Sequence, residues 1–392
     1  MTPVAAIALT SALTALSALP LDVMLPSFGA IADEYETSVD AVASLVGYFA
    51  IAFSMLQLVV GPLSDRIGRQ RVLIFGLAIA TIGAIGGTLA QTYTAHLAFR
   101  LIQACGCSCF VLAQAILQDT FPGETGLRAR IFNVTFGGLC IACSPLLGAV
   151  LQENFGWRAS FWLFSAIGAG VFLQVLSHPS DRNHTSTLTL ASCARRYLQI
   201  ATNRAFFAYT LLGAMAFASH FAFVILSPSL FIEALKFSSY DYAYTLLLYG
   251  AIYLLGGFVA NHASRQITVF KQIQLGIALL SVASVVMTTL YVWLGDHFAT
   301  VIAPMLLATL GTTLIRPAAA TLSMKIFETH AGTAAAAAGA IRFSMAGIIS
   351  IGVSSVPLSK FLLLALLLLS AAAICMAIQW VQFKRDAAEF VC

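Results

Sequence analysis

The sequence predicts an all-α polytopic membrane protein with twelve transmembrane helices in two six-helix bundles. Of its 392 residues, 60% are hydrophobic and only 9% are charged, and the mean hydropathy is +0.91. A soluble domain cannot bury that much apolar surface, because surface-to-volume scaling requires a large polar shell. Charged residues and clusters of Pro and Gly divide the chain into apolar runs close to the roughly 20 residues that a spanning helix needs.

These apolar runs predict the twelve spans in order. The expected spans cover residues 4–28, 42–62, 71–91, 95–117, 131–151, 159–177, 205–230, 242–260, 272–294, 298–322, 332–356 and 361–383. The first run lacks the basic start and the small-residue cleavage site of a signal peptide, so we expect it to be retained as a span.

The basic residues predict which side of the membrane each connection faces, because cytoplasmic loops hold an excess of Lys and Arg. Of the 20 basic residues, fourteen fall on one side of the predicted map, three on the other side and three inside spans. We therefore expect a multi-pass protein of the inner (cytoplasmic) membrane with both termini in the cytoplasm. An acidic cluster without nearby basic residues then lies outside (Asp33, Glu34, Glu36 and Asp40).

The longest polar stretch divides the chain near its middle. It predicts an N-terminal bundle over residues 1–177, a central cytoplasmic loop over 178–204 and a C-terminal bundle over 205–392. Two halves of six spans are typical of transporters that are built from parallel repeats.

Other classes of function lack a signal in the sequence. The cysteines lie mostly inside apolar runs, where they are expected to pack as small hydrophobic residues and not to hold a metal. No nucleotide-binding loop or catalytic set is present, so we expect neither an enzyme nor a cofactor, and energy from the proton gradient instead of ATP. The expected partners are the lipid bilayer, protons and a small-molecule substrate, with no nucleic acid, and we expect a monomer.

The connection between the second and third spans reads Gly61-Pro-Leu-Ser-Asp65-Arg66-Ile-Gly68-Arg69-Gln-Arg71. It resembles the loop signature of the major facilitator superfamily in its residues, in its position between the second and third spans, and in lying on the cytoplasmic side of the membrane. The resemblance implies that Gly61, Asp65, Gly68 and Arg69 act as a conformational latch without contacting substrate. The alternative is a loop that only fixes the orientation of the chain.

The first and fourth spans each carry a charge. Leu19-Pro20-Leu-Asp22-Val-Met24-Leu-Pro26 and Arg100-Leu-Ile-Gln103 resemble elements of drug/proton antiporters of the bicyclomycin-resistance (Bcr/CflA-like) branch. The resemblance implies that Asp22 and Arg100 couple transport to protons. A charge inside a bilayer needs a partner or a water-filled cavity. The alternatives are an inert, solvated Asp22 at the outer helix end and an Arg100 that only ties helices together.

The fifth span contains Ser144-Pro145-Leu-Leu-Gly148, which is similar to the antiporter motif of the superfamily, with Ser and Ala in place of its first and last Gly. Pro145 removes a helix hydrogen bond and Gly148 permits close contact between helices. We expect both to act in helix packing.

Candidate substrate contacts in the second half are two arginines and several ring residues. Arg316 in the tenth span and Arg342 in the eleventh should face a cavity or a polar partner. We expect His220 to be the only histidine within a span, where it either titrates or packs in its neutral form. The ring residues that we propose for the cavity wall are Phe217, Phe221 and Tyr249.

Two transport functions compete. The first is a proton-coupled antiporter that exports small amphipathic molecules or drugs by rocker-switch alternating access. The second is a dedicated exporter of an anionic metabolite, such as a carboxylate-rich, siderophore-like metal chelator, which the extra arginines favour because Arg binds carboxylates in bidentate fashion. Uptake by proton symport is a third possibility.

Overall fold

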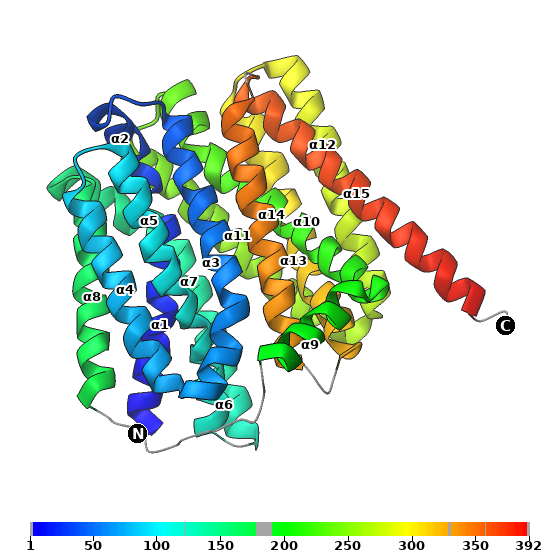
Figure 1. Cartoon of the computed structure of the whole chain (residues 1–392). Helices are drawn as coiled ribbons and strands as arrows, with labels where there is room; N and C mark the ends of the chain where they lie inside the picture. Colours follow the sequence, from blue (N-terminus) through cyan, green and yellow to red (C-terminus); the bar gives the residue numbers. More distant parts are fainter. Residues whose placement is uncertain (1–2, 122, 178–189, 328–330, 357, 390–392) are drawn as a thin grey trace. The chain divides into compact units, whose positions relative to one another are not determined.

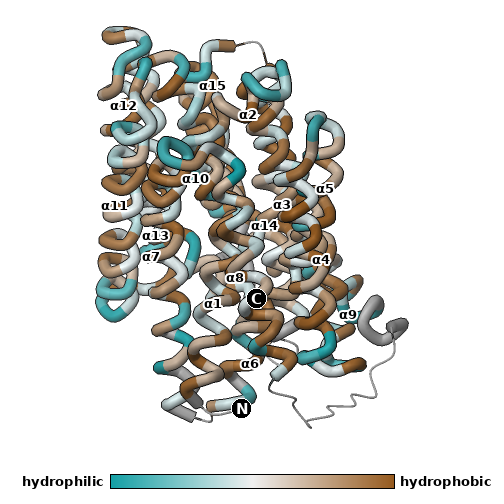
Figure 2. The backbone as a smooth tube through the Cα atoms, turned by 90° about the vertical axis from the view of Figure 1, so that its left-hand side faces the viewer, coloured by the Kyte–Doolittle hydropathy of each residue, from teal (hydrophilic) through white to brown (hydrophobic). Residues whose placement is uncertain are grey.

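The computed structural model describes residues 3–121, 123–177, 190–327, 331–356 and 358–389. This part of the chain forms helices joined by short connections and contains no strand. Twelve of its helical stretches are long and apolar enough to cross a membrane. The predicted fold class is therefore confirmed, and Figure 2 shows the reason: apolar residues fill the helix bodies while hydrophilic residues gather toward their ends.

The chain divides into two compact units. Unit 1 comprises Met1–Cys193 together with Ser238–Gly250, and unit 2 comprises Ala194–Phe237 together with Ala251–Cys392. The long helix α11 (Ser239–Gln266) therefore begins in unit 1 and ends in unit 2. 

Unit 1 holds the first six spans. Its elements are α1 (Pro3–Asp22), η1 (Leu25–Ser27), α2 (Phe28–Glu34), α3 (Val39–Ile67), α4 (Arg69–Leu89), α5 (Tyr93–Cys107), η2 (Ser108–Val111), α6 (Leu112–Thr120), α7 (Gly123–Phe155) and α8 (Arg158–Ser177). Helix α4 packs against α5 and α8, and α1 packs against α6, α7 and α8 (Figure 1).

Unit 2 holds the last six spans except for the first part of the eighth, which belongs to unit 1. Its elements are α9 (Leu190–Thr202), α10 (Arg204–Ser227), η3 (Pro228–Ala234), the second part of α11, α12 (Val269–Leu294), α13 (Phe298–Lys325), α14 (Ala331–Ser355) and α15 (Lys360–Glu389). Helix α10 packs against α13, α14 and α15. Within the stretch predicted as a central loop, residues 190–202 form α9, and residues 178–189 lie outside the described part.

Glycines set the closest helix pairs in both units. In unit 1 a Cβ on Gly106 of α5 would overlap the backbone of Ala80 in α4. In unit 2 a Cβ on Gly276 of α12 would lie 2.7 Å from the carbonyl oxygen of Gly311 in α13. These contacts leave no room for a side chain, so the third and fourth spans, and likewise the ninth and tenth, are held at backbone distance.

Two spans are interrupted where proline enters. The first span changes from α1 to a 3₁₀ turn that contains Pro26, and the seventh changes from α10 to a π-helical turn that begins at Pro228. Proline has no backbone N–H to continue the helix ladder, and π turns often occur at functional sites. In transporters, broken helices expose backbone groups that line binding sites.

Candidate functional site

The break in the first span exposes a backbone acceptor in unit 1. Helix α1 ends at Asp22, and the 3₁₀ turn Leu25–Ser27 follows. Pro26 cannot donate to the carbonyl of Asp22, four residues earlier, so the ladder cannot continue past this point. The carbonyl of Pro20, in the last turn of α1, accepts a hydrogen bond from a side chain of another helix.

That donor is Arg100 of α5, which is 1% exposed. Its Nη2 donates to the Pro20 carbonyl at 2.7 Å and lies 3.3 Å from the Met24 sulfur, and its Nη1 donates to Oε1 of Gln103 at 2.8 Å. The guanidinium carbon lies 4.5 Å from the ring centre of Phe49. Neutral acceptors and a ring face thus hold a charge that would be costly to leave unpaired in a membrane.

Asp22, two residues after Pro20, takes no part in this hydrogen-bond network. Its side chain is half-buried, and the described residues give it no hydrogen-bond or ion-pair partner. Arg100 is occupied by the Pro20 carbonyl and Gln103, so a direct Asp22–Arg100 link is not formed. The carboxylate therefore remains open to a proton, to water or to a cationic ligand.

The motif of the fifth span supports the break. Pro145 and Gly148 lie inside α7, and a Cβ on Gly148 would overlap the carbonyl oxygen of Val23. Only glycine at this position lets the chain immediately after Asp22 pass so close to α7. This close approach links the motif of the fifth span directly to the break of the first span.

The predicted latch residues lie at the junction of α3 and α4. Gly61 is inside α3, and Gly68 joins the two helices with a φ of +98°, a conformation that favours glycine. Arg69 forms an ion pair of 2.5 Å with Asp119 at the end of α6. The sequence singled out Asp65 in this motif and missed Asp119, which its position at the end of the fourth span could have indicated.

A second cluster forms in unit 2 around Phe217 of α10. The guanidinium carbons of Arg316 and Arg342 lie 4.9 Å and 5.5 Å from the centre of its ring. Arg316 Nη1 donates to the hydroxyl of Tyr253 at 2.8 Å. Among the described residues, Arg342 contacts the rings of Phe217 and Phe343. Its buried Nε has no hydrogen-bond acceptor among them. Two cations therefore share a cluster that holds no described carboxylate.

The other predicted ring residues divide between the units. His220 lies 5.4 Å from the ring of Tyr253, and Phe221 lies 5.6 Å from that of Phe217, so both belong to the Phe217 cluster. Tyr249 is 3% exposed and lies in unit 1. Tyr253, which lies one helical turn after Tyr249 on the same side of α11, makes the contacts of the cluster; the sequence prediction named Tyr249 and missed Tyr253.

A histidine that the sequence prediction missed lies in unit 1. His96 is fully buried in α5, so the expectation that His220 is the only histidine within a span is wrong. Its Nδ1 lies 2.9 Å from the carbonyl of Gly87, and its ring packs on Trp157 at 5.5 Å. Beside it, Arg158 forms a two-pronged ion pair with Glu34 and so joins α8 to α2.

A comparison with protein families decides which family these features belong to. The model described as "Major Facilitator Superfamily" matches residues 8–351. The chain belongs to the major facilitator superfamily. Its family and its fold are those of membrane transporters, as the loop motif at Gly61 suggested.

Curated superfamily relatives carry names of drug resistance. A "Chloramphenicol resistance protein" of Pseudomonas aeruginosa is 25% identical over 352 residues, which cover 88% of this chain and 81% of the relative. The "Multidrug resistance protein MdtL" of Escherichia coli is 27% identical over 231 residues, which cover 58% of each chain. These names agree with the resemblance of the sequence to drug exporters.

Solved structures of the superfamily share the fold at low sequence identity. A D-xylose-proton symporter has a TM-score of 0.73 at 15% identity and covers 95% of this chain and 97% of its own. A bacterial homologue of the human lysosomal transporter Spinster, in an inward-facing and occupied conformation, has a TM-score of 0.75 at 14% identity, with 97% and 96% covered. At these identities the likeness concerns the fold alone.

Proposed function

We propose that this protein is a proton-coupled antiporter that exports small amphipathic molecules across the inner membrane by rocker-switch alternating access. The observation that carries the proposal is the carboxylate of Asp22, which stands unpartnered among the described residues at the break of the first span. The relatives named for chloramphenicol and multidrug resistance support export and this class of substrate.

The proposed coupling step is proton exchange at Asp22. A proton that binds to the carboxylate from outside neutralises a charge next to the Arg100 site and is released when the site opens inward. A cationic or polar substrate competes for the same carboxylate from the inside. A proton or substrate can drive the conformational change only through different affinities for the two states. In the proposed orientation both termini lie in the cytoplasm.

Asp22→Asn should abolish proton movement driven by substrate, because the amide cannot bind a proton at neutral pH. The measurement uses the purified protein in liposomes with an internal pH-sensitive dye and added chloramphenicol. The matched control is Asp33→Asn, which neutralises an exposed carboxylate on α2 of the same span and should leave the signal unchanged. Unaltered proton-coupled transport by the Asp22→Asn protein would remove Asp22 from the mechanism.

A second candidate function is the export of an anionic metabolite. The observation that favours it is the pair Arg316 and Arg342 around Phe217. Two guanidiniums without a described carboxylate partner offer bidentate donors to a carboxylate-rich molecule, and the ring between them can stack on a flat substrate. Keeping both charges in place would disfavour a purely cationic drug as substrate.

Arg316→Ala distinguishes the two substrates. In the same liposomes, a response to a tricarboxylate that is lost on Arg316→Ala, in protein that remains folded, would support the metabolite exporter. A response to chloramphenicol alone, unchanged by Arg316→Ala, would support drug export and leave Arg316 a structural role. Arg316→Lys keeps the charge but loses the two-pronged geometry and should give an intermediate result for the tricarboxylate.

A further inference from the structure

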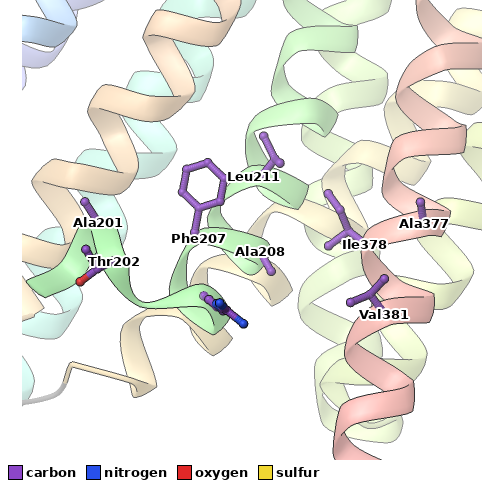
Figure 3. Close-up of a pocket in the computed structure, with 9 residues that line it drawn as sticks. Ala201, Thr202, Phe207, Ala208, Leu211, Ala377, Ile378 and Val381 are labelled. Carbon is purple, nitrogen blue, oxygen red and sulfur yellow. The ribbon is translucent and has the colours of Figure 1, made fainter.

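An apolar groove of about 420 Å³ opens in unit 2 where α10 begins and the span in α15 ends. Figure 3 shows the residues that line it on two helices, Phe207, Ala208 and Leu211 on α10 and Ala377, Ile378 and Val381 on α15. Phe207 is 45% exposed and Val381 is 47% exposed, so the walls are open to the surroundings. A groove of this composition on a membrane-spanning bundle is suited to a hydrocarbon chain.

Two of the lining residues are polar, and only one of them is available to a ligand. The hydroxyl of Thr202 already donates within α9, to the carbonyls of Leu198 and Gln199. The exposed guanidinium of Arg204 lines the mouth of the groove, and no hydrogen bond or ion pair engages it in the described part of the chain. The apolar groove therefore has one cationic side chain that is available to a ligand.

The position along the helices places this cation at the depth of lipid headgroups. Trp380 precedes the lining residue Val381 and is 59% exposed, and exposed tryptophans concentrate where a membrane meets water. Arg204 is the first residue of α10, at the same end of the span. Basic pockets between transmembrane helices at such a level bind anionic lipid headgroups.

We propose that this groove binds one anionic phospholipid, with an acyl chain between α10 and α15 and the phosphate at the Arg204 guanidinium. The apolar walls favour a ligand with a hydrocarbon chain over a small inorganic anion, and the single unengaged cation favours an anionic lipid over a neutral one. The proposal does not depend on the direction or substrate of transport, because the site belongs to unit 2 alone and contains none of the residues of the Phe217 cluster.

The test counts the lipids that remain on the full-length protein in native mass spectrometry after release from nanodiscs of phosphatidylcholine and phosphatidylglycerol. The wild type should retain one phosphatidylglycerol in preference to phosphatidylcholine. Arg204→Ala should lower that preference about five-fold, which corresponds to the loss of one basic contact at a lipid surface. Arg204→Lys should keep most of it, since a point charge suffices for a phosphate.

Two further variants separate the groove from general attraction. Arg195→Ala removes an exposed cation of α9 that does not line the groove and should leave the preference unchanged. Ala208→Trp fills the groove and should displace the retained lipid while Arg204 is intact. Equal retention of both lipids by the wild type, or an equal loss in the Arg195→Ala and Arg204→Ala proteins, would overturn the proposal.

Discussion

Each of the two units carries an arginine in its fourth span, but the two arginines differ in burial and in the groups that accept their hydrogen bonds. Arg100 lies in the fourth span and contacts the ring of Phe49 in the second, while Arg316 lies in the tenth and contacts Tyr253 in the eighth. Such correspondence is expected of parallel repeats. Arg100 is almost completely buried on a backbone carbonyl, whereas Arg316 is half-buried on a phenol hydroxyl.

The difference follows from what surrounds each arginine. In unit 1 the broken first span supplies a carbonyl acceptor, Gly148 brings α7 against the break, and an acid stands beside it. In unit 2 the eleventh span brings a second cation, Arg342, to the same ring that Arg316 contacts. One scaffold thus presents an acid beside a single buried arginine in one half and two arginines around one ring in the other.

The largest expected effect is on stability and separates the two arginines. Arg100→Ala leaves the Pro20 carbonyl and Gln103 without their donor in a buried place, so it should lower the free energy of unfolding by about 3 kcal/mol. Arg316→Ala should lower it by less than about 1 kcal/mol, because Tyr253 can turn to water. Thermal unfolding of both proteins in the same detergent measures the difference. Equal losses in the free energy of unfolding would mean that Arg316 stabilises its unit as much as Arg100 does.

A smaller effect tests the support of the break. Gly148→Ala places a methyl group against the Val23 carbonyl and should cost about 1–3 kcal/mol through overpacking. Gly170→Ala in α8 has open space around its Cβ and should gain up to about 1 kcal/mol from helix propensity. The same unfolding assay serves for both proteins. A stable Gly148→Ala protein with intact proton coupling would show that the close approach is not needed.

The smallest expected effect tests whether the Phe217 cluster binds substrate. Tyr253→Phe removes the hydroxyl that accepts from Arg316 but keeps the ring. If the two arginines bind a carboxylate, the substitution frees Arg316 from a competing acceptor and should raise the affinity for a tricarboxylate by about five- to tenfold, the net value of one ordinary hydrogen bond. Tyr244→Phe, at an exposed position of α11, is the control and should have no effect. Isothermal titration calorimetry in detergent measures the affinity of both variants for the tricarboxylate.

Composition and the spacing of the apolar runs by themselves determined the fold class and the twelve spans, and the motif at Gly61 indicated the family through its resemblance to the superfamily's loop signature. Apolar runs of about 20 residues cross a bilayer as helices, because a helix satisfies its backbone hydrogen bonds within one segment and needs that length to span the hydrocarbon core. The motif residues of the loop at Gly61 could also be identified from the sequence, as could Asp22 and Arg100, because charged residues inside spans are rare.

The partners of those residues were decided only by the tertiary structure. The sequence does not reveal that Arg100 binds the Pro20 carbonyl, that Arg69 pairs with Asp119, or that Arg316 donates to Tyr253. Each of these contacts joins residues far apart in the chain and depends on how the helices are rotated about their axes. A helix with a nearly uniform apolar surface carries little information about that rotation, so packing against its neighbours sets it.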